Sequence, residues 1–340
     1  MRAILFDRHG GPEVLEEREV PEPPRAGGEV LVRIRAAAVN HFDLDLRRGT
    51  SGLDLRLPHQ LGLEGTGEIA WAEDASSFRG GERVIVGSYA SCHRCEACLS
   101  GLPNLCENLS RPGVERSGTY ADIVSVPEEL LDPIPEGVTF EEAAGIASSF
   151  GTAHHALVVR ARMRPGEAIL VTGAAGGVGS ALVQLAKLGG AYVIALVGSD
   201  AKAEVAKELG ADAVAVGEDA LNEAIGPFGG AVDIIVDGGG GTFLERGLSL
   251  LRPRGRYVVY GAHAGVLGRV DVMAFFRSYV SLVASTGWTR ADMGRVLDLL
   301  GRGRIRLLIH DTLPLSEAAR AHALLEGRRV FGKILLRPGA

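Results

Sequence analysis

Several residue types are scarce in this sequence, and each scarcity excludes a class of protein. Aromatic residues make up 5% of the chain, lysine occurs only four times, and the net charge of −6 includes no block of like charge. The sequence therefore gives no reason to expect nucleic acid or an anionic membrane as a partner. It also lacks a secretory signal and an apolar run of about 18 residues, so we expect a cytoplasmic protein without a membrane-spanning helix.

Cysteine is equally scarce, and the cysteines all lie in one segment, SCHRCEACLSGLPNLC (91–106). A disulfide-stabilised secreted protein would spread its cysteines through the chain. Four sulfur atoms in one loop instead predict a structural zinc site, because Zn²⁺ favours four ligands and a closed set leaves no position for a substrate. Uncoordinated thiols and an iron–sulfur cluster stay open as alternatives, although the fourth cysteine of such a cluster usually follows sooner and precedes proline. The predicted zinc ligands are Cys92, Cys95, Cys98 and Cys106.

From residue 167 onward, short apolar runs alternate with helical patterns. AILVTG (168–173) predicts a strand buried on both faces, and SALVQLAKLGG (180–190) predicts a helix with one apolar stripe. The alternation continues through further β–α units as far as RYVVYG (256–261). This pattern predicts an α/β fold with a doubly wound parallel sheet. The high glycine content, 47 of 340 residues, fits the tight turns of such a fold.

The turn AAGGVG (174–179) joins the first of these strands to its helix and carries a relaxed dinucleotide fingerprint. Gly176 would let the backbone approach a pyrophosphate. Gly177 and Val178 would meet the same group at the helix N-terminus, where free N–H groups point outward. The sequence therefore predicts a dinucleotide site here, with a nucleotide-free α/β fold as the alternative.

The end of the next strand bears on which dinucleotide binds. NAD-preferring sites usually carry a carboxylate about 20 residues after the glycine turn, to bind the ribose 2′-hydroxyl. Here the strand ends with Ser199, and Lys202 adds a positive charge one turn later. This pair favours the 2′-phosphate of NADPH. The alternative is NADH, with Lys202 as an ordinary solvated residue.

Motifs along essentially the whole chain resemble the medium-chain dehydrogenase/reductase superfamily, which includes zinc alcohol dehydrogenases and quinone oxidoreductases. In the family's order they are GGPEVL (10–15), VNHFDLDLRRG (39–49), LPHQLGLEGTGEI (57–69), the cysteine segment, GTYADIV (118–124), EEAAGIASSFGTAHHAL (141–157), the glycine turn and RRVFGKILL (328–336). The resemblance implies a β-rich GroES-like catalytic domain over 1–145 and 286–340, with a Rossmann coenzyme domain over 146–285 inserted into it. It also implies a homodimer or homotetramer formed through the edge strand near 269–275.

The sequence departs from the zinc-dependent members of this family at the positions that hold their catalytic zinc. Those positions carry Asn40, Leu63 and, near the third, Ser148, which are poor zinc ligands. We therefore expect no catalytic zinc, and interpret Glu64 either as a remnant of the residues that surround the zinc ligands or as a buried carboxylate. Without a Lewis acid, alcohol oxidation is harder, and hydride transfer to an already electrophilic carbon is favoured. α,β-Unsaturated carbonyls and quinones are such acceptors, and hydrogen-bond donors can stabilise the charge that forms on their oxygen.

The resemblance also implies roles for individual residues. Zinc-free quinone oxidoreductases carry the pair Asn40 and Asp43, which implies that Asn40 binds the substrate carbonyl or the nicotinamide ribose and that Asp43 orients neighbours or relays a proton. Asp45, where these relatives often have tyrosine, implies a more polar pocket. The alternative for each of these three polar residues is a structural role, as a partner in a hydrogen bond at a domain interface. The residues implied along the coenzyme and its cleft are Thr152, Gly239, Gly261, Thr286, Gly287 and Lys333.

The predicted function is NADPH-dependent, zinc-independent reduction of an activated double bond or a quinone, with a small molecule as substrate. A zinc-free carbonyl, alcohol or imine oxidoreductase is the first alternative. An NADPH-binding sensor or structural protein with little catalysis is the second. The two classes differ in whether coenzyme binding is accompanied by reduction of any electrophile.

Overall fold

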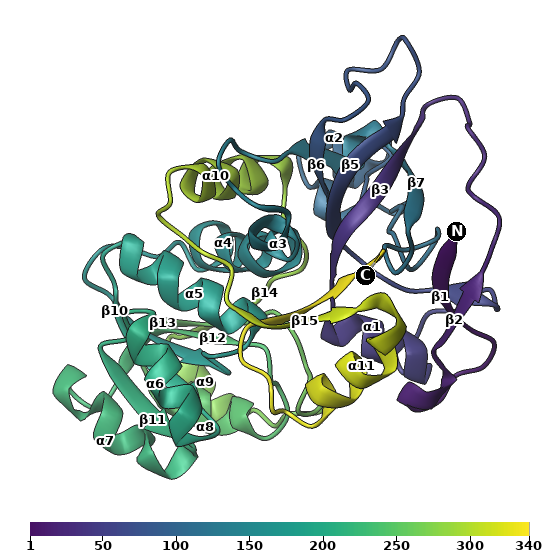
Figure 1. Cartoon of the computed structure of the whole chain (residues 1–340). Coiled ribbons are helices and arrows are strands. Elements are labelled where there is room, and N and C mark those ends of the chain that lie inside the picture. Colours follow the sequence, from purple (N-terminus) through teal and green to yellow (C-terminus); the bar gives the residue numbers. More distant parts are fainter. Residues whose placement is uncertain (340) are drawn as a thin grey trace. The chain divides into compact units, whose positions relative to one another are not determined.

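The computed structural model describes residues 1–339 and divides into two compact units (Figure 1). The first unit comprises Met1–Ser148 and Leu297–Ala340, and the second comprises Ser149–Val296. Both boundaries fall later in the chain than the predicted 145/146 and 285/286. The second boundary lies within helix α10 (Arg290–Gly301), which begins in one unit and ends in the other. Within the described residues, no helix is both long and apolar enough to cross a membrane.

The first unit is built on a mixed sheet with the strand order β15-β16-β3-β5-β6-β8, and β7 pairs with β3. A smaller sheet has the order β2-β1-β4. The strands are β1 (Arg2–Phe6), β2 (Glu16–Glu19), β3 (Glu29–Ala38), β4 (His59–Gln60), β5 (Gly65–Trp71), β6 (Arg83–Val86), β7 (Ile123–Pro127), β8 (Leu131–Pro133), β15 (Ile309–Pro314) and β16 (Lys333–Arg337). The helices are α1 (His41–Arg48), α2 (Glu96–Leu99), α3 (Phe140–Ala143) and α11 (Ala318–Glu326).

Strand β3 places the residues that follow it. Its middle alternates between exposed Arg33 and Arg35 and buried Ile34, as expected for a strand with one face on the core. At its end, β16 runs antiparallel to it, with Leu335 opposite Ala38. This register brings the start of the C-terminal strand beside the residues that follow β3.

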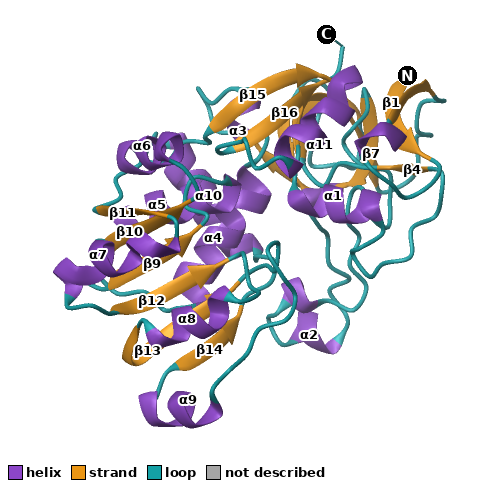
Figure 2. Cartoon of the chain, turned by 90° about the horizontal axis from the view of Figure 1, so that it is seen from below, coloured by secondary structure: helices purple, strands orange, loops and turns teal. Residues whose placement is uncertain are grey.

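The second unit contains a parallel sheet with the order β11-β10-β9-β12-β13-β14, which corresponds to the doubly wound order 3-2-1-4-5-6 (Figure 2). The predicted alternation of strands and helices is confirmed. The strands are β9 (Ala168–Thr172), β10 (Tyr192–Val197), β11 (Ala213–Val216), β12 (Val232–Asp237), β13 (Leu251–Val259) and β14 (Ser281–Ala284). The helices are α4 (Thr152–His154), α5 (Gly177–Leu188), α6 (Asp200–Glu208), α7 (Leu221–Ile225), α8 (Phe243–Ser249) and α9 (Val272–Ser278).

Helix α1 is held beside α11 by buried polar side chains of the first unit (Figure 1). Arg47, which is fully buried, forms an ion pair with Glu326 and donates from Nη1 to Nδ1 of His322 at 3.2 Å. Arginine only donates, so Nδ1 of His322 is an acceptor and its Nε2 carries the proton. That Nε2 lies 3.3 Å from the hydroxyl oxygen of Tyr120, which completes the link from α11 to the core.

This link predicts a dependence of stability on pH. Burial, followed by the positive charge of Arg47, lowers the pKa of His322 to about 3. The unfolded chain takes up the proton near pH 6.5, so the contribution of His322 to stability is present above that pH and is lost as the pH falls toward 3. We expect the free energy of unfolding in urea to fall across this window by up to ~1.4 kcal/mol per pH unit from this group.

A variant isolates the histidine from other acid effects. Burial raises the pKa of Asp43 to about 6, and this smaller shift acts in the opposite direction between about pH 4 and 6. His322→Asn keeps an acceptor toward Arg47 but cannot titrate, so its stability should depend less steeply on pH. His41→Asn, on the exposed side of α1, should keep the wild-type slope. Equal slopes for wild type and His322→Asn would contradict the prediction.

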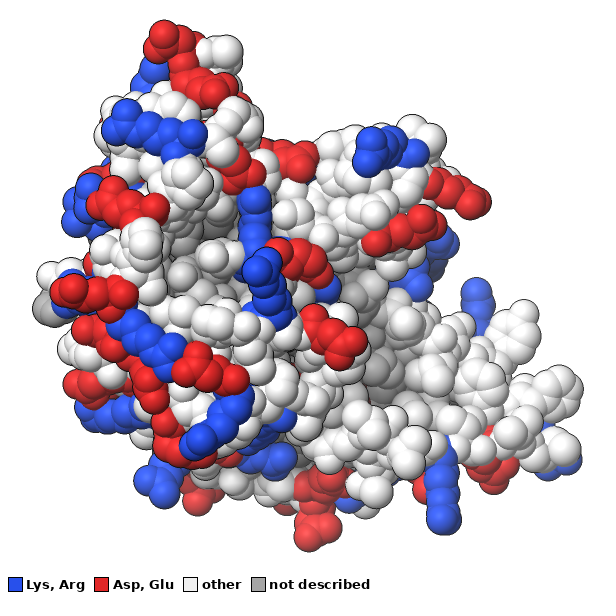
Figure 3. Space-filling view, turned by 90° about the vertical axis from the view of Figure 1, so that its right-hand side faces the viewer, with Lys and Arg blue, Asp and Glu red and all other residues white. Residues whose placement is uncertain are grey.

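On the face drawn in Figure 3, acidic and basic side chains are interspersed, and no broad area carries charge of one sign.

Candidate active site

Four polar side chains of the first unit meet where β3 ends and β16 begins. Nζ of Lys333 lies 2.6 Å from Oδ1 of Asn40 and 3.2 Å from Oε1 of Glu64. The hydroxyl of Ser148 lies 2.8 Å from Oδ1 of Asn40 and also contacts Oε1 of Glu64. The backbone N–H of Ser148 donates to Oε2 of Glu64 at 2.8 Å. We call Asn40, Glu64, Ser148 and Lys333 the polar cluster.

The polar cluster has a buried side and an accessible side. Glu64 is 0% exposed and Lys333 is 5% exposed, whereas Asn40 and Ser148 are partly exposed. A buried carboxylate needs a compensating charge and hydrogen bonds, and the Lys333 ammonium and the Ser148 N–H supply them. A ligand of the cluster would therefore meet Asn40 and Ser148 first.

Asn40 lies at this accessible side, but its amide is already engaged. Its Nδ2 donates to the carbonyl oxygen of Ala38 and to Oε1 of Glu64, each at 3.2 Å. Its Oδ1 receives the contacts from Lys333 and Ser148. Within residues 1–339 these contacts use both amide hydrogens, so a substrate carbonyl would bind Asn40 only by displacing one of them.

The residues around the cluster do not fit a catalytic zinc. The predicted ligand positions hold an amide, an apolar side chain (Leu63) and a hydroxyl, whereas zinc favours thiolate, imidazole and carboxylate. Moreover, the Lys333 ammonium contacts the same oxygen atoms that a cation would need, those of Asn40 and Glu64. A divalent ion there would be repelled by the ammonium.

The side chains of the other two residues that the sequence predicted as catalytic do not join the side chains of the polar cluster. Asp43 is fully buried and caps α1, because its carboxylate accepts from the backbone N–H groups of Asn40 at 2.8 Å and Gly62 at 3.3 Å. The Tyr120 hydroxyl donates to it at 3.3 Å. Asp45 is half-buried on α1, and within residues 1–339 no hydrogen bond joins its carboxylate to the polar cluster.

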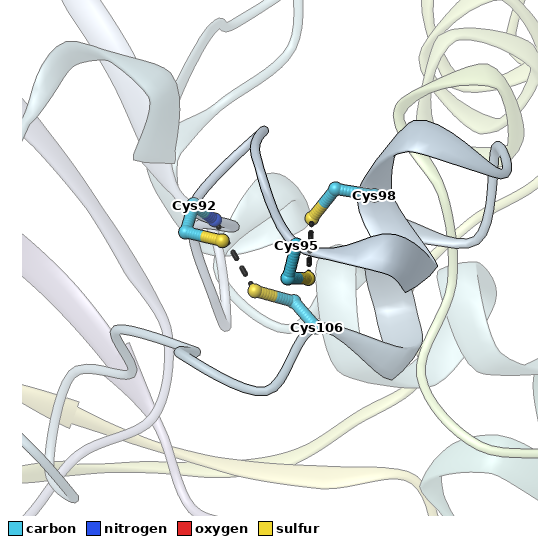
Figure 4. A group of neighbouring side chains, drawn as sticks. All are labelled: Cys92, Cys95, Cys98 and Cys106. Carbon is cyan, nitrogen blue, oxygen red and sulfur yellow. Dashed lines mark hydrogen bonds between the residues drawn. The ribbon is translucent and has the colours of Figure 1, made fainter.

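The predicted zinc ligands come together in space. The sulfur atoms of Cys92, Cys95, Cys98 and Cys106 all lie within 4.8 Å of one another and face a common centre (Figure 4). A tetrahedral Zn–S₄ site with bonds of about 2.3 Å has sulfur atoms roughly 3.8 Å apart, so the group needs little adjustment to bind zinc. The backbone N–H groups of Cys92 and Asn108 donate to Sγ of Cys106 at 3.2 and 3.3 Å. The residues present therefore fit a structural zinc ion.

In the second unit, the turn between β9 and α5 fits a dinucleotide. Helix α5 begins at Gly177, and its first N–H groups point toward the turn, as a bound pyrophosphate requires. Gly173, which sequence reasoning did not single out, has a positive φ of 57°. A Cβ on Gly179 would lie 2.1 Å from the carbonyl oxygen of Gly173, so only glycine lets the helix pack this close to the strand. The position of Gly173 directly after a buried strand could have identified it.

A second glycine loop follows the neighbouring strand β12 and is held by Asp237, which sequence reasoning also missed. The carboxylate of Asp237 is buried and accepts from the N–H groups of Gly239 at 2.8 Å and Gly240 at 2.9 Å. It also accepts from the hydroxyls of Thr172 at 2.6 Å, at the end of β9, and Tyr257 at 2.8 Å. Asp237 thus joins the ends of two strands at the point where the strand order reverses, which is where ligands bind in open α/β sheets. The sequence held a signal for this role, because Asp237 ends an apolar run and directly precedes a run of glycines.

Most of the remaining predicted coenzyme residues follow the ends of strands of the same sheet. Ser199 precedes α6 at the end of β10, and Lys202 lies in the first turn of that helix. Three more follow the ends of β13 and β14, where parallel strands present their carboxyl ends together: Gly261, Thr286 and Gly287. Thr152 begins α4, and Lys333 belongs to the polar cluster of the first unit.

Comparison with known proteins places this arrangement in a family. The alcohol dehydrogenase GroES-like domain matches residues 26–136, and the zinc-binding dehydrogenase domain matches residues 177–302. An alcohol dehydrogenase of Geobacillus stearothermophilus is 32% identical over 96% of each chain, and an acryloyl-coenzyme A reductase of Metallosphaera sedula is 30% identical over 99% of each. A solved structure described as an NAD-dependent alcohol dehydrogenase is 38% identical, covers 100% of both chains and superimposes with a TM-score of 0.95. The chain therefore belongs to the medium-chain dehydrogenase/reductase superfamily and is an oxidoreductase of that superfamily.

Proposed function

We propose that this protein is an NADPH-dependent, zinc-independent reductase of activated double bonds, with α,β-unsaturated carbonyl compounds or quinones as substrates. The observation that carries the proposal is the polar cluster, in which the amide of Asn40 and the hydroxyl of Ser148 occupy positions where the resemblance implies zinc ligands, and the ammonium of Lys333 contacts that amide. The relative named acryloyl-coenzyme A reductase, whose name describes a substrate of this class, supports the same assignment.

The chemistry follows from the donors of the cluster. A bound nicotinamide coenzyme would supply the hydride. Reduction at the β-carbon of an enone moves the π electrons toward the carbonyl oxygen, which becomes anionic. Hydrogen-bond donors stabilise this charge without a metal, and the ammonium group of Lys333 is such a donor. Addition of a proton at the α-carbon, from water or a side chain, then gives the saturated carbonyl compound.

The choice of NADPH rests on the end of β10. Ser199 has a hydroxyl that, among the described residues, makes no capping hydrogen bond to α6, and Lys202 lies one turn away. Neither Val197 nor Gly198 offers the carboxylate that NAD-preferring sites place there. Lys202→Ala should therefore raise the Michaelis constant for NADPH more than that for NADH, and equal changes would contradict this choice of coenzyme.

A second candidate function is favoured by the names of relatives. The solved structure at 38% identity is described as an NAD-dependent alcohol dehydrogenase. If this chain shared that activity, it would have to stabilise an alkoxide with side chains alone, because its cluster does not fit zinc. We rank this candidate second for that reason.

One assay separates the two candidates from a protein that only binds coenzyme. Oxidation of NADPH is followed by its absorbance with an enone, a quinone and an aldehyde, and reduction of NAD⁺ and NADP⁺ is followed with a secondary alcohol. The proposed function predicts turnover with the enone or the quinone. Turnover with the alcohol and NAD⁺ alone would support the second candidate, and coenzyme binding without any turnover would indicate a sensor.

We also propose that the chain self-associates through α9 and β14, near the edge predicted from the resemblance. The sheet ends at β14, and no residue of α9 is buried. Large apolar side chains are exposed here in a number that is unusual for a free surface. They are Val266, Leu267, Val272, Met273, Phe276, Tyr279 and Leu282.

Charge introduced at this surface should dissociate the oligomer. We expect wild-type protein to be at least dimeric by light scattering and Phe276→Glu to shift it toward the monomer, because each copy would bury an unpaired carboxylate. Val216→Glu, which changes an exposed apolar residue on β11 at the opposite edge, is the matched control and should remain associated. A monomeric wild type, or the same oligomeric state for both variants, would contradict this proposal.

A further inference from the structure

We propose that the ammonium group of Lys333 takes over the catalytic role of the missing metal, as the cation that binds the anionic oxygen of the substrate. This inference rests on the proposed function and names the residue that carries its main electrostatic effect. It assigns Lys333 to substrate chemistry, whereas the sequence had predicted it along the coenzyme.

The hydrogen bonds of Lys333 leave a donor for this purpose. An ammonium group has three N–H bonds, and two of them are used by Oδ1 of Asn40 at 2.6 Å and Oε1 of Glu64 at 3.2 Å. Within residues 1–339 the third N–H has no protein acceptor. A buried N–H without an acceptor favours a ligand that brings one, and the oxygen of a carbonyl or enolate does so.

The surroundings of Lys333 increase its effect on a developing charge. Lys333 is 5% exposed and Glu64 is fully buried, so water screens the ammonium weakly. The contacts to Asn40 and Glu64 hold the ammonium in place before the reaction, and it therefore needs no reorganisation when negative charge appears. These are the properties that make a fixed metal ion effective, provided here by a side chain.

The reaction balances with Lys333 keeping its proton throughout. A C–H bond forms at the β-carbon while NADPH is oxidised to NADP⁺, and the π pair of the double bond moves to give an enolate. The third N–H of Lys333 donates to the enolate oxygen. Water then delivers a proton to the α-carbon and the C=O bond is restored, while the hydroxide that remains takes up a proton from the solvent.

Removing Lys333 alone would leave Glu64 as an unpaired buried charge and would destabilise the fold. The decisive variant is therefore Lys333→Met/Glu64→Gln, which removes both charges together. We expect it to retain thermal stability and NADPH binding, while kcat for an enone falls about 10²- to 10³-fold, the loss typical of a missing oxyanion donor. The primary isotope effect with deuterated NADPH should rise, because the chemical step becomes slower. Lys333→Arg, which keeps the cation, should recover much of the loss.

The matched control is Lys207→Met/Glu204→Gln, which removes an exposed ion pair with a 2.8 Å contact on α6. It should leave kcat and the isotope effect unchanged. A Lys333→Met/Glu64→Gln variant that folds and keeps the wild-type kcat would overturn the proposal, because Lys333 would then serve only to neutralise Glu64.

A binding experiment separates this proposal from the proposed function. The probe is 4-nitrophenol, whose visible absorbance reports whether it is bound as the phenol or as the phenolate, added to protein saturated with NADP⁺. We expect wild type to favour the phenolate, and the preference to be lost in Lys333→Met/Glu64→Gln but kept in the Lys207 control. If wild type favours the phenolate but reduces no enone or quinone, the proposed function fails and the role of Lys333 stands. If enones are reduced but the preference survives in the Lys333 double variant, the role of Lys333 fails and the function stands.

Discussion

Replacement of Cys106 by serine is expected to abolish zinc binding and to unfold the segment that the cysteines hold together. Cys106 is buried, and two backbone N–H groups donate to its sulfur atom. Beyond the short helix α2, the segment 91–106 contains little regular structure, so a bound zinc ion would supply most of its stability. Structural zinc contributes on the order of 10 kcal/mol of folding free energy at neutral pH. The variant should therefore lose several kcal/mol of stability, shown by a lower thermal midpoint.

Metal analysis by mass spectrometry checks this expectation. Wild type should contain one zinc per chain, and Cys106→Ser should contain almost none. His93→Ala is the control, because His93 lies in the same segment but is exposed and its side chain contacts Glu129. Two zinc ions per wild-type chain would contradict the conclusion that the polar cluster does not fit zinc. Iron with inorganic sulfide in place of zinc would support the cluster that the sequence left open.

Replacement of Gly179 by alanine is expected to destroy the coenzyme site of the second unit. The added Cβ would lie 2.1 Å from the carbonyl oxygen of Gly173 and 2.8 Å from the Cα of Ala174, and both obstacles are backbone atoms. Helix α5 must then move away from β9, which removes its N–H groups from the position of the pyrophosphate. We expect the dissociation constant for NADPH to rise at least about 100-fold, which corresponds to ~2.7 kcal/mol.

Titration of the intrinsic fluorescence of NADPH measures this change directly. The matched control is Gly294→Ala, which makes the same substitution in the exposed middle of α10, where no atom of residues 1–339 lies within 4 Å of the new Cβ. Because glycine is unfavourable in a helix interior, this control should be stabilised by about 0.5–1 kcal/mol and should bind NADPH normally. An unchanged affinity in Gly179→Ala would show that the turn does not form the coenzyme site.

Features that depend on neighbours in the sequence were predictable. The cysteines lie within fifteen residues of one another, and this spacing alone indicated a common metal centre. The predicted alternation of strands and helices from residue 168 is also confirmed, because strands buried on both faces require continuous apolar runs that the sequence displays. The glycine turn lies between β9 and α5, as the pattern indicated. The fingerprint has Ala174 at its first position, but in the structure the residue with positive φ is its neighbour Gly173.

The roles of the polar residues were less predictable, because they depend on partners distant in the sequence. Asn40 and Asp43 were predicted as a functional pair from the resemblance of their segment to that of zinc-free quinone oxidoreductases. In the structure, the carboxylate of Asp43 caps α1. The amide of Asn40 is hydrogen-bonded to the side chains of Glu64, Ser148 and Lys333. Burial and pairing decide such roles, and neither can be read from the residue type.

By itself, the sequence determined the clustering of the four cysteines, the α/β fold and the residue types at the positions where the resemblance implies zinc ligands. Only the tertiary structure decided what stands in their place. Asn40 and Lys333 are 293 residues apart, and they meet because β16 pairs with β3 in a register that sets Leu335 opposite Ala38. A shift of one residue in that register would direct the Lys333 side chain to the opposite face of the sheet, away from Asn40 and Glu64. The cation at the centre of the candidate site is therefore a consequence of strand pairing, which the local sequence does not encode.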